Sequence, residues 1–260
     1  MEFIDSHCHP HFDVFSSDPD GVLQSAAEVG VKRVIAVGTT LADSQKAIDF
    51  AVARSNVWAS AGVHPHEASE FLQNTEAQGQ LTQLLNKSSI VAVGEIGLDY
   101  YKNYAPQKDQ LACLQQQIEI GLPTGLPFIF HVRDAWDDFW SVIDDYPGLS
   151  GVVHSFSSDE QQLDKALSRG LYVALNGIMT FTRDEKQLAA AKKVPADKLL
   201  LETDAPFLAP KPFRGQTCEP KHIRTIAEFL AELREQTLSD LAETTTRNAL
   251  ELFTMDSHGK

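Results

Sequence analysis

The chain has 260 residues, of which 43% are hydrophobic and 22% are charged, so it is long enough for a large buried core and ordinary in composition for a globular protein. Its net charge of −14 argues against a broad basic face for duplex nucleic acid, although bound divalent cations can reverse the sign locally. We expect no membrane span, no signal peptide and no disulfide framework. The chain has no apolar run of about 18 residues, no basic start, and only three scattered cysteines, so we expect a cytoplasmic protein.

Eight short apolar runs, each typical of a β-strand, alternate with helical patterns along the chain. We expect the strands at residues 3–7, 32–37, 57–63, 90–95, 127–131, 151–155, 171–175 and 198–203. The helices are expected at residues 19–29, 42–54, 77–86, 106–120, 135–144, 160–169, 184–192, 222–234 and 239–253. Asp18 is the expected N-cap of the first helix, and residues 257–260 are expected to fray.

The alternation of strands and helices predicts a parallel sheet covered by helices. Several strands, such as residues 34–37 and 90–93, are continuous apolar runs, as expected of strands buried on both faces. Eight such units predict an α/β fold of the TIM (β/α)₈ barrel type, forming a single domain over residues 1–260. The alternative is an open doubly wound sheet, which normally carries a glycine-rich turn after its first strand. The chain has His7-Cys8-His9 in that place.

Ionisable residues stand at the ends of five of the expected strands: His7, Glu95, His131, His154 and Asp204. The C-terminal ends of barrel strands form one rim, and active sites of such barrels lie there. We therefore expect these five side chains to point at a common centre.

A second histidine belongs to the same set. His7 and His9 are two residues apart in an expected strand, so they share a face, and Cys8 points away. Imidazoles and carboxylates together suit Zn, Mn, Fe or Co. Catalytic zinc usually takes about three protein ligands. Six candidates therefore favour two ions that share a carboxylate, about 3.5–4 Å apart.

The alternative for any single one of these histidines is a satisfied core residue. Six ionisable groups at corresponding strand ends are difficult to explain in that way, because burying them without partners is costly. The set as a whole therefore favours a metal site.

The candidate residues lie in short segments that are distinctive in combination. These are FIDSHCH (3–9), AGVHPH (61–66), VGEIGLD (93–99), HVRDA (131–135), HSFS (154–157) and LETDAP (201–206). Together they closely resemble the TatD family of metal-dependent deoxyribonucleases, and the resemblance covers nearly the whole chain.

The resemblance implies a hydrolase that cleaves phosphodiester bonds in DNA, mostly as an exonuclease on single strands. It also implies two divalent ions (Mg, Mn or Zn). Carried over by position, one ion is held by His7, His9, Glu95 and Asp204. The other is held by Glu95, His131 and His154, so that Glu95 bridges the two.

The expected mechanism uses a water activated by both ions. Asp204, with the bridging Glu95, is the best candidate to orient that water and accept its proton. His64 resembles an active-site position of the family and could bind the phosphate or carry a proton. His66 is either a second polar group of this rim or a loop histidine without a role.

Four further residues have an expected role at or near the site. Arg133 could pair with phosphate, or form a salt bridge with a neighbouring aspartate. Arg214 could bind an anion, or be an ordinary exposed residue. Trp136 stands where the family often has a histidine, and it could stack a base or belong to the core. Asp99 is expected to fix a loop or a ligand.

The expected partner is single-stranded DNA, with no membrane, and the expected state is a monomer. Two other functions stay open at this point. One is an amidohydrolase or small-molecule phosphoesterase that uses the same pair of metal ions, which the acidic surface and sparse arginines favour. The other is a non-catalytic metal-binding or scaffold protein, against which the complete set of candidate ligands argues.

Overall fold

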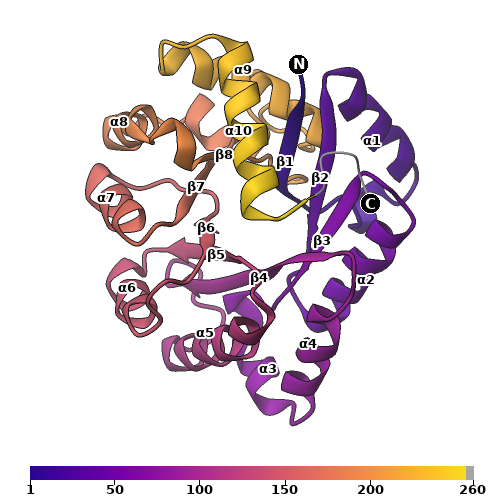
Figure 1. The fold of residues 1–260 in the computed structure, drawn as a ribbon, viewed down its shortest axis with the longest axis vertical. Coiled ribbons are helices and arrows are strands. Elements are labelled where there is room, and N and C mark those ends of the chain that lie inside the picture. The colour runs from indigo at the N-terminus through magenta and orange to yellow at the C-terminus, as the bar shows by residue number, and fades with distance from the viewer. Residues whose placement is uncertain (256–260) are drawn as a thin grey trace.

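Eight parallel strands follow one another in chain order around a barrel in the computed structural model, which describes residues 1–255 (Figure 1). The strands are β1 (Phe3–Cys8), β2 (Val31–Val37), β3 (Val57–Ala61), β4 (Ile90–Asp99), β5 (Phe128–Arg133), β6 (Gly151–Val153), β7 (Tyr172–Leu175) and β8 (Leu199–Leu201). Each strand pairs in parallel with the next. The predicted TIM barrel is therefore confirmed.

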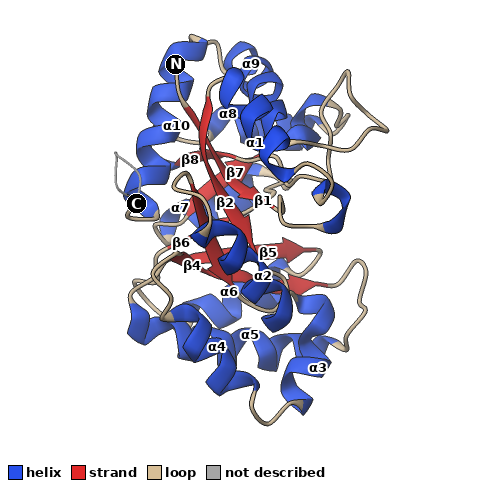
Figure 2. Cartoon of the chain, turned by 90° about the vertical axis from the view of Figure 1, so that its right-hand side faces the viewer, coloured by secondary structure: helices blue, strands red, loops and turns tan. Residues whose placement is uncertain are grey.

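Helices surround the strands, as Figure 2 shows. They are α1 (Pro19–Glu28), α2 (Leu41–Val52), α3 (Ala68–Gln73), α4 (Ala77–Leu85), α5 (Gln107–Gly121), α6 (Trp136–Asp144), α7 (Glu160–Ser168), α8 (Glu185–Lys193), α9 (Ile223–Leu233) and α10 (Leu238–Leu252). Every expected helix is present, and Asp18 caps α1 by accepting a hydrogen bond from the Gly21 amide. The sequence did not predict α3, because six residues are too few to show a helical period. The fraying expected at residues 257–260 lies outside the described residues.

The barrel interior is apolar at the end where the strands begin. Ile4, Ile35 and Trp58 pack there with Leu252 and Phe253, which end or follow α10. Asn248 Nδ2 donates to the carbonyls of Ala196 and Leu199, which ties α10 to the start of β8. This helix therefore closes the N-terminal end of the barrel. Within residues 1–255, no helix is long and apolar enough to cross a membrane.

Hydrogen bonds beyond the strand ends join β1 to the segment after β8. The Asp204 amide donates to the His7 carbonyl at 2.9 Å, and the His9 amide donates to the Ala205 carbonyl at 2.7 Å. The buried Asp5 carboxylate also accepts from the Thr203 amide, at 2.9 Å. These contacts bring Asp204 beside the histidines of β1.

The two strands that carry His7 and Glu95 are irregular at those residues. Asp5 and Cys8 of β1 pair with Val34 and Ala36, so three steps along β1 match two along β2. The same mismatch occurs in β4 between Val93 and Ile96. Bulges of this kind change the direction of a side chain and are common beside active sites.

The bulge in β4 also corrects one expectation. Glu95 was expected at the strand end, but β4 continues to Asp99. The bulge needs a glycine at position 94 for two reasons. The φ of Gly94 is 149°, and a Cβ atom there would lie 2.7 Å from the Ile129 carbonyl oxygen. The sequence alternation alone could not show that the strand passes through the site instead of ending at it.

Candidate metal centre

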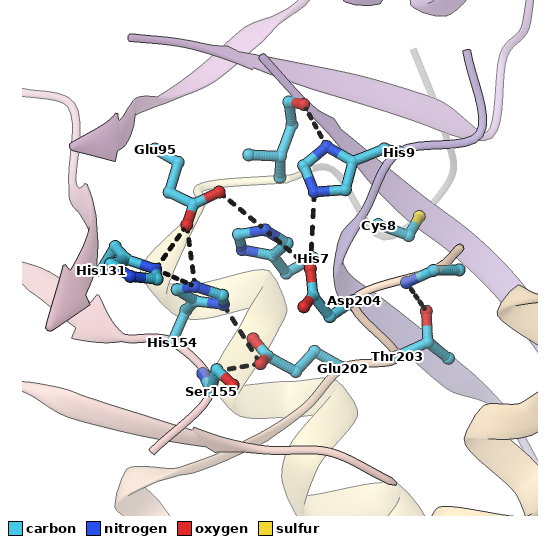
Figure 3. Close-up of polar contacts among 12 residues, drawn as sticks. His7, Cys8, His9, Glu95, His131, His154, Ser155, Glu202, Thr203 and Asp204 are labelled. Carbon is cyan, nitrogen blue, oxygen red and sulfur yellow. Dashed lines mark hydrogen bonds and ion pairs between the residues drawn. The ribbon is translucent and has the colours of Figure 1, made fainter. Parts of the chain in front are cut away.

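The Glu95 carboxylate lies at the centre of a group of imidazoles (Figure 3). Its Oε1 is 2.9 Å from both His131 Nδ1 and His154 Nε2, and 3.5 Å from His64 Nε2. Its Oε2 is 3.4 Å from His7 Nε2. The two oxygens therefore face different histidines.

Asp204 is the second carboxylate of the cluster. Its Oδ1 is 3.6 Å from His7 Nε2 and 3.4 Å from His9 Nε2. His9 Nδ1 donates to the Val37 carbonyl at 2.7 Å, which leaves the Nε2 lone pair facing Asp204. Cys8 points away, as expected, with its Sγ 3.5 Å from the Ile35 carbonyl oxygen.

The structure thus brings all six predicted ligands together and adds His64 to them. The donor atoms of His7, His9 and Glu95 lie within 4.8 Å of one another, as do those of His64, Glu95 and His131. Both ring nitrogens of His7 are buried without a hydrogen-bond partner, which is unusual for buried polar atoms. A divalent cation would satisfy Nε2, which faces Glu95 and Asp204, so this donor set fits a metal centre.

The electrostatics of the cluster favour an ionised carboxylate. Burial by itself would raise the pKa of Glu95, but the imidazoles around it, led by His154 and His64, hold that pKa well below its usual range. Burial holds the pKa of His64 well below the usual value for histidine, and the neighbouring His131 lowers it further. Burial would lower the pKa of His154, but Glu95 and Glu202 raise it well above the usual value, so this ring holds a proton that a bound divalent ion would displace.

A second group of polar residues orients two of the imidazoles. Glu202 is fully buried, and its Oε1 lies 3.3 Å from His154 Nδ1. The same oxygen accepts from the Ser155 amide at 2.7 Å and from Asn176 Nδ2 at 3.0 Å. A carboxylate behind a ligating histidine fixes its ring and raises its basicity. Neither Glu202 nor Asn176 was given a role from sequence, although Glu202 stands two residues before Asp204.

Asp99 supports the other imidazole. Its Oδ2 lies 3.3 Å from His131 Nε2 and 3.0 Å from His66 Nε2, and its Oδ1 accepts from the Lys102 amide. Asp99 therefore touches both a candidate ligand and the loop after β4, in agreement with the expectation. His66 contacts Asp99, outside the ligand cluster itself.

A cleft of about 520 Å³ opens over the cluster, and Lys102 and Arg133 are the only lysine or arginine among the described residues that line it. The Arg133 guanidinium lies 3.8 Å from the Tyr101 ring centroid. Arg214 does not line the cleft. Its guanidinium lies 3.8 Å from the Phe181 ring centroid and donates to the Ala209 carbonyl.

Trp136 packs away from the cleft. Its ring stacks on Trp140, with centroids 5.6 Å apart, and meets the edge of Phe156 at 5.8 Å. Of the two possibilities that the sequence left open, the structure favours the core position.

Residues 4–254 match the family described as TatD-related DNases. The chain belongs to the TatD family of metal-dependent hydrolases. It is 36% identical to an uncharacterized metal-dependent hydrolase of Escherichia coli strain K12, YcfH, over 99% of this chain and 97% of that protein. It is 35% identical to the 3'-5' ssDNA/RNA exonuclease TatD of Cronobacter sakazakii, over 92% of this chain and 93% of that protein.

Solved structures of the TatD family share the whole fold. The TatD homologue YjjV of Escherichia coli K12 superposes with a TM-score of 0.90 at 31% identity, covering 98% of both chains. The predicted family and the predicted class of enzyme are therefore confirmed.

Proposed function

We propose that this enzyme hydrolyses phosphodiester bonds in single-stranded DNA as an exonuclease, and that it uses two divalent ions. The observation that carries the proposal is the Glu95 carboxylate, whose Oε1 faces His131 and His154 and whose Oε2 faces His7. The exonuclease activity named for the Cronobacter relative supports the choice of substrate.

The ligand assignment follows from the direction of each contact. On the Oε2 side of Glu95, one ion would be held together with His7, His9 and Asp204. On the Oε1 side, a second ion would be held together with His131 and His154. Two ions of this kind would lower the pKa of a bound water toward neutrality and withdraw charge from a phosphoryl oxygen.

Asp204 is the proposed proton acceptor. Its side chain is 15% exposed, whereas that of Glu95 is 5% exposed, so water entering the cleft reaches Asp204 more easily. Its backbone is anchored to the His7 carbonyl, which holds the carboxylate at the mouth of the cluster. A base fixed within reach of the attacking water is what general-base catalysis requires.

Three groups are placed to bind the scissile phosphate. His64 lines the cleft, and its Nδ1 accepts from the His66 amide at 3.2 Å, so the ring would carry its proton on Nε2, which lies 3.5 Å from Glu95 Oε1. Arg133 and Lys102 line one side of the same cleft and supply positive charge. Charged donors and a neutral N–H together would hold the phosphate and offset the charge that builds on it.

The test is an assay of the purified protein with Mg²⁺, Mn²⁺ or Zn²⁺ on end-labelled DNA. Single-stranded DNA should shorten one nucleotide at a time, and the same sequence as a duplex should be cut more slowly. Labelling either end shows the direction of cleavage. Intact single-stranded DNA, together with rapid hydrolysis of a simple ester or amide, would refute the proposal.

A small-molecule phosphoesterase is a second candidate, and the size and charge of the cleft favour it. About 520 Å³ is within the usual range for small-molecule sites, and only two cationic side chains among the described residues line the cleft. Activity on chromogenic phosphodiesters or mononucleotides that exceeds activity on oligonucleotides would select this candidate.

A further inference from the structure

The exposed aromatic side chains gather at one end of the barrel. The chain has 14 Phe, 5 Tyr and 3 Trp. Within residues 1–255 only three of these are exposed: Tyr101 at 59%, Tyr104 at 69% and Phe207 at 52%. Scattered exposed apolar residues need no explanation, but all three belong to loops that follow strands at the rim around the metal centre.

The three rings form two groups on opposite edges of the rim. Tyr101 and Tyr104 lie in the loop after β4, and Phe207 follows β8. Because strand order around the barrel follows the sequence, β4 and β8 are half a barrel apart (Figure 1). The metal centre lies between these two edges.

Each group also touches residues that line the cleft. Phe207 itself lines it, and its ring lies 6.4 Å from Phe12 and 6.1 Å from His9, edge to face in both cases. On the opposite edge, the ring of Tyr104 meets that of His66 at 4.7 Å. His66 is in turn held by Asp99. Both rings therefore rest on a fixed support and keep most of their surface open.

The charge of the protein makes such rings useful for binding a nucleic acid. Affinity for nucleic acid usually comes mainly from cations on phosphates. This chain has a net charge of −14, and apart from the two proposed ions only Lys102 and Arg133 among the described residues bring positive charge to the cleft. Base stacking on aromatic rings is the other general source of affinity for single strands, and it tolerates any sequence because every base has a π face.

We propose that Phe207 and Tyr104 stack nucleobases on opposite sides of the scissile phosphate, and so make the enzyme select single-stranded nucleic acid. This inference rests on the proposed nuclease function. Bases of a duplex are paired and stacked on one another, so they cannot lie on these rings. Arg133 and Lys102, which are proposed to hold the scissile phosphate, belong to the Tyr104 edge, and the Phe207 edge contributes stacking without a cation among the lining residues.

The test compares Phe207→Ala and Tyr104→Ala with the wild-type enzyme in Mn²⁺. Two substrates are used: a single-stranded oligonucleotide and methyl 4-nitrophenyl phosphate, which has no base. Each variant should raise KM for the oligonucleotide by at least about five-fold, the lower end of what one stacked base contributes. The rise in KM for the oligonucleotide should exceed the rise in KM for the small diester by a similar factor.

Conservative variants and a matched control complete the experiment. Phe207→Trp and Tyr104→Phe should restore most of the affinity, because they keep a flat ring. The effects of the two alanine changes should multiply in the double variant, because the sites are on opposite edges. Val52→Ala removes an exposed apolar side chain at the far end of α2 and should change nothing.

The outcomes separate this inference from the function on which it rests. An oligonucleotide KM that stays at the wild-type value in both alanine variants overturns the stacking proposal and leaves the nuclease proposal standing. An equal rise in KM for the oligonucleotide and for the small diester has the same meaning: it overturns the stacking proposal and leaves the nuclease proposal standing. A wild-type enzyme that neither cuts single-stranded DNA nor, without metal, binds a fluorescent oligonucleotide overturns both.

Discussion

The two ends of this barrel are equally buried but are stabilised differently. At the N-terminal end the interior holds Ile4, Trp58 and Phe253, each at most 5% exposed, and α10 closes it. At the C-terminal end the interior holds His7 and Glu95, which are also at most 4% exposed. Apolar side chains gain free energy from burial, whereas buried ionisable groups lose it unless they find partners.

The difference shows where stability and function are separated in the molecule. The apolar end can be completed by packing alone, with α10 as its last element. The polar end leaves both ring nitrogens of His7 without a hydrogen bond, and an ion would satisfy the Nε2 atom, which faces Glu95 and Asp204. We therefore expect changes at the two ends to have different effects, one on unfolding and the other on turnover.

The largest effect expected of a single substitution follows from Asp204→Asn. Asparagine tolerates the φ of 58° at this position, so the backbone should stay in place while the proton acceptor is lost. Turnover of DNA should fall by about 10³-fold, within the usual contribution of a general base. Urea unfolding of the metal-free protein should keep its midpoint. A lower midpoint, or turnover within ten-fold of the wild type, would contradict the division between the two ends.

Phe253→Ala tests the opposite end. Phe253 is 2% exposed and packs in the barrel interior below the strands, so its loss should leave a cavity. The free energy of unfolding should fall by about 3–5 kcal/mol, as for other buried phenylalanines. Turnover per folded molecule should not change, and Phe253→Leu should recover most of the stability. A selective loss of turnover in the alanine variant would show that the two ends are coupled.

Much of this division could be predicted from the sequence, because it depends on local patterns. Apolar runs at regular intervals predicted the eight strands, and His7, Glu95, His131, His154 and Asp204 stood near their ends. The bulge at Glu95 could not be predicted, since it depends on how β4 fits against β5. Glu202 was missed for a similar reason. Its contact with His154 joins residues that follow two different strands, and a carboxylate next to a strand has no local pattern that shows where it points.

Removal of the metal should lower both the activity and the free energy of unfolding, because the buried polar groups at the C-terminal end then lack a partner. A chelator should abolish activity, and Mn²⁺ should restore it. At a free ion concentration about 100 times the dissociation constant, one bound ion should raise the free energy of unfolding by about 2.7 kcal/mol. In the His131→Ala variant, the same ion should raise the free energy of unfolding by less. An unfolding midpoint that does not respond to any divalent cation would argue against a metal centre.

A smaller effect is expected at Glu202, which touches a proposed ligand but no ion. Glu202→Gln keeps the size and the contact with the Ser155 amide, but it removes the charge behind His154. Changes of this kind usually reduce metal affinity or activity by 10- to 100-fold, so we expect about 30-fold weaker metal binding. Excess Mn²⁺ should then recover part of the turnover, which separates orientation of a ligand from direct catalysis. Turnover that stays low at saturating metal would instead place Glu202 in the reaction itself.

The smallest expected effect is at Asp18, which lies near the rim but outside the cleft. Its side chain caps α1 through the Gly21 amide, so Asp18→Ala leaves that amide without its partner. The free energy of unfolding should fall by about 1 kcal/mol in Asp18→Ala. It should fall by less in Asp18→Asn, because asparagine keeps an acceptor oxygen. Turnover and metal affinity should equal those of the wild type, because the residue touches neither a ligand nor the cleft. If Asp18→Ala reduced turnover, then a change at this end of the barrel would affect function even where the residue contacts neither a ligand nor the cleft. If it does not, the functional effects at this end belong to the residues of the candidate metal centre.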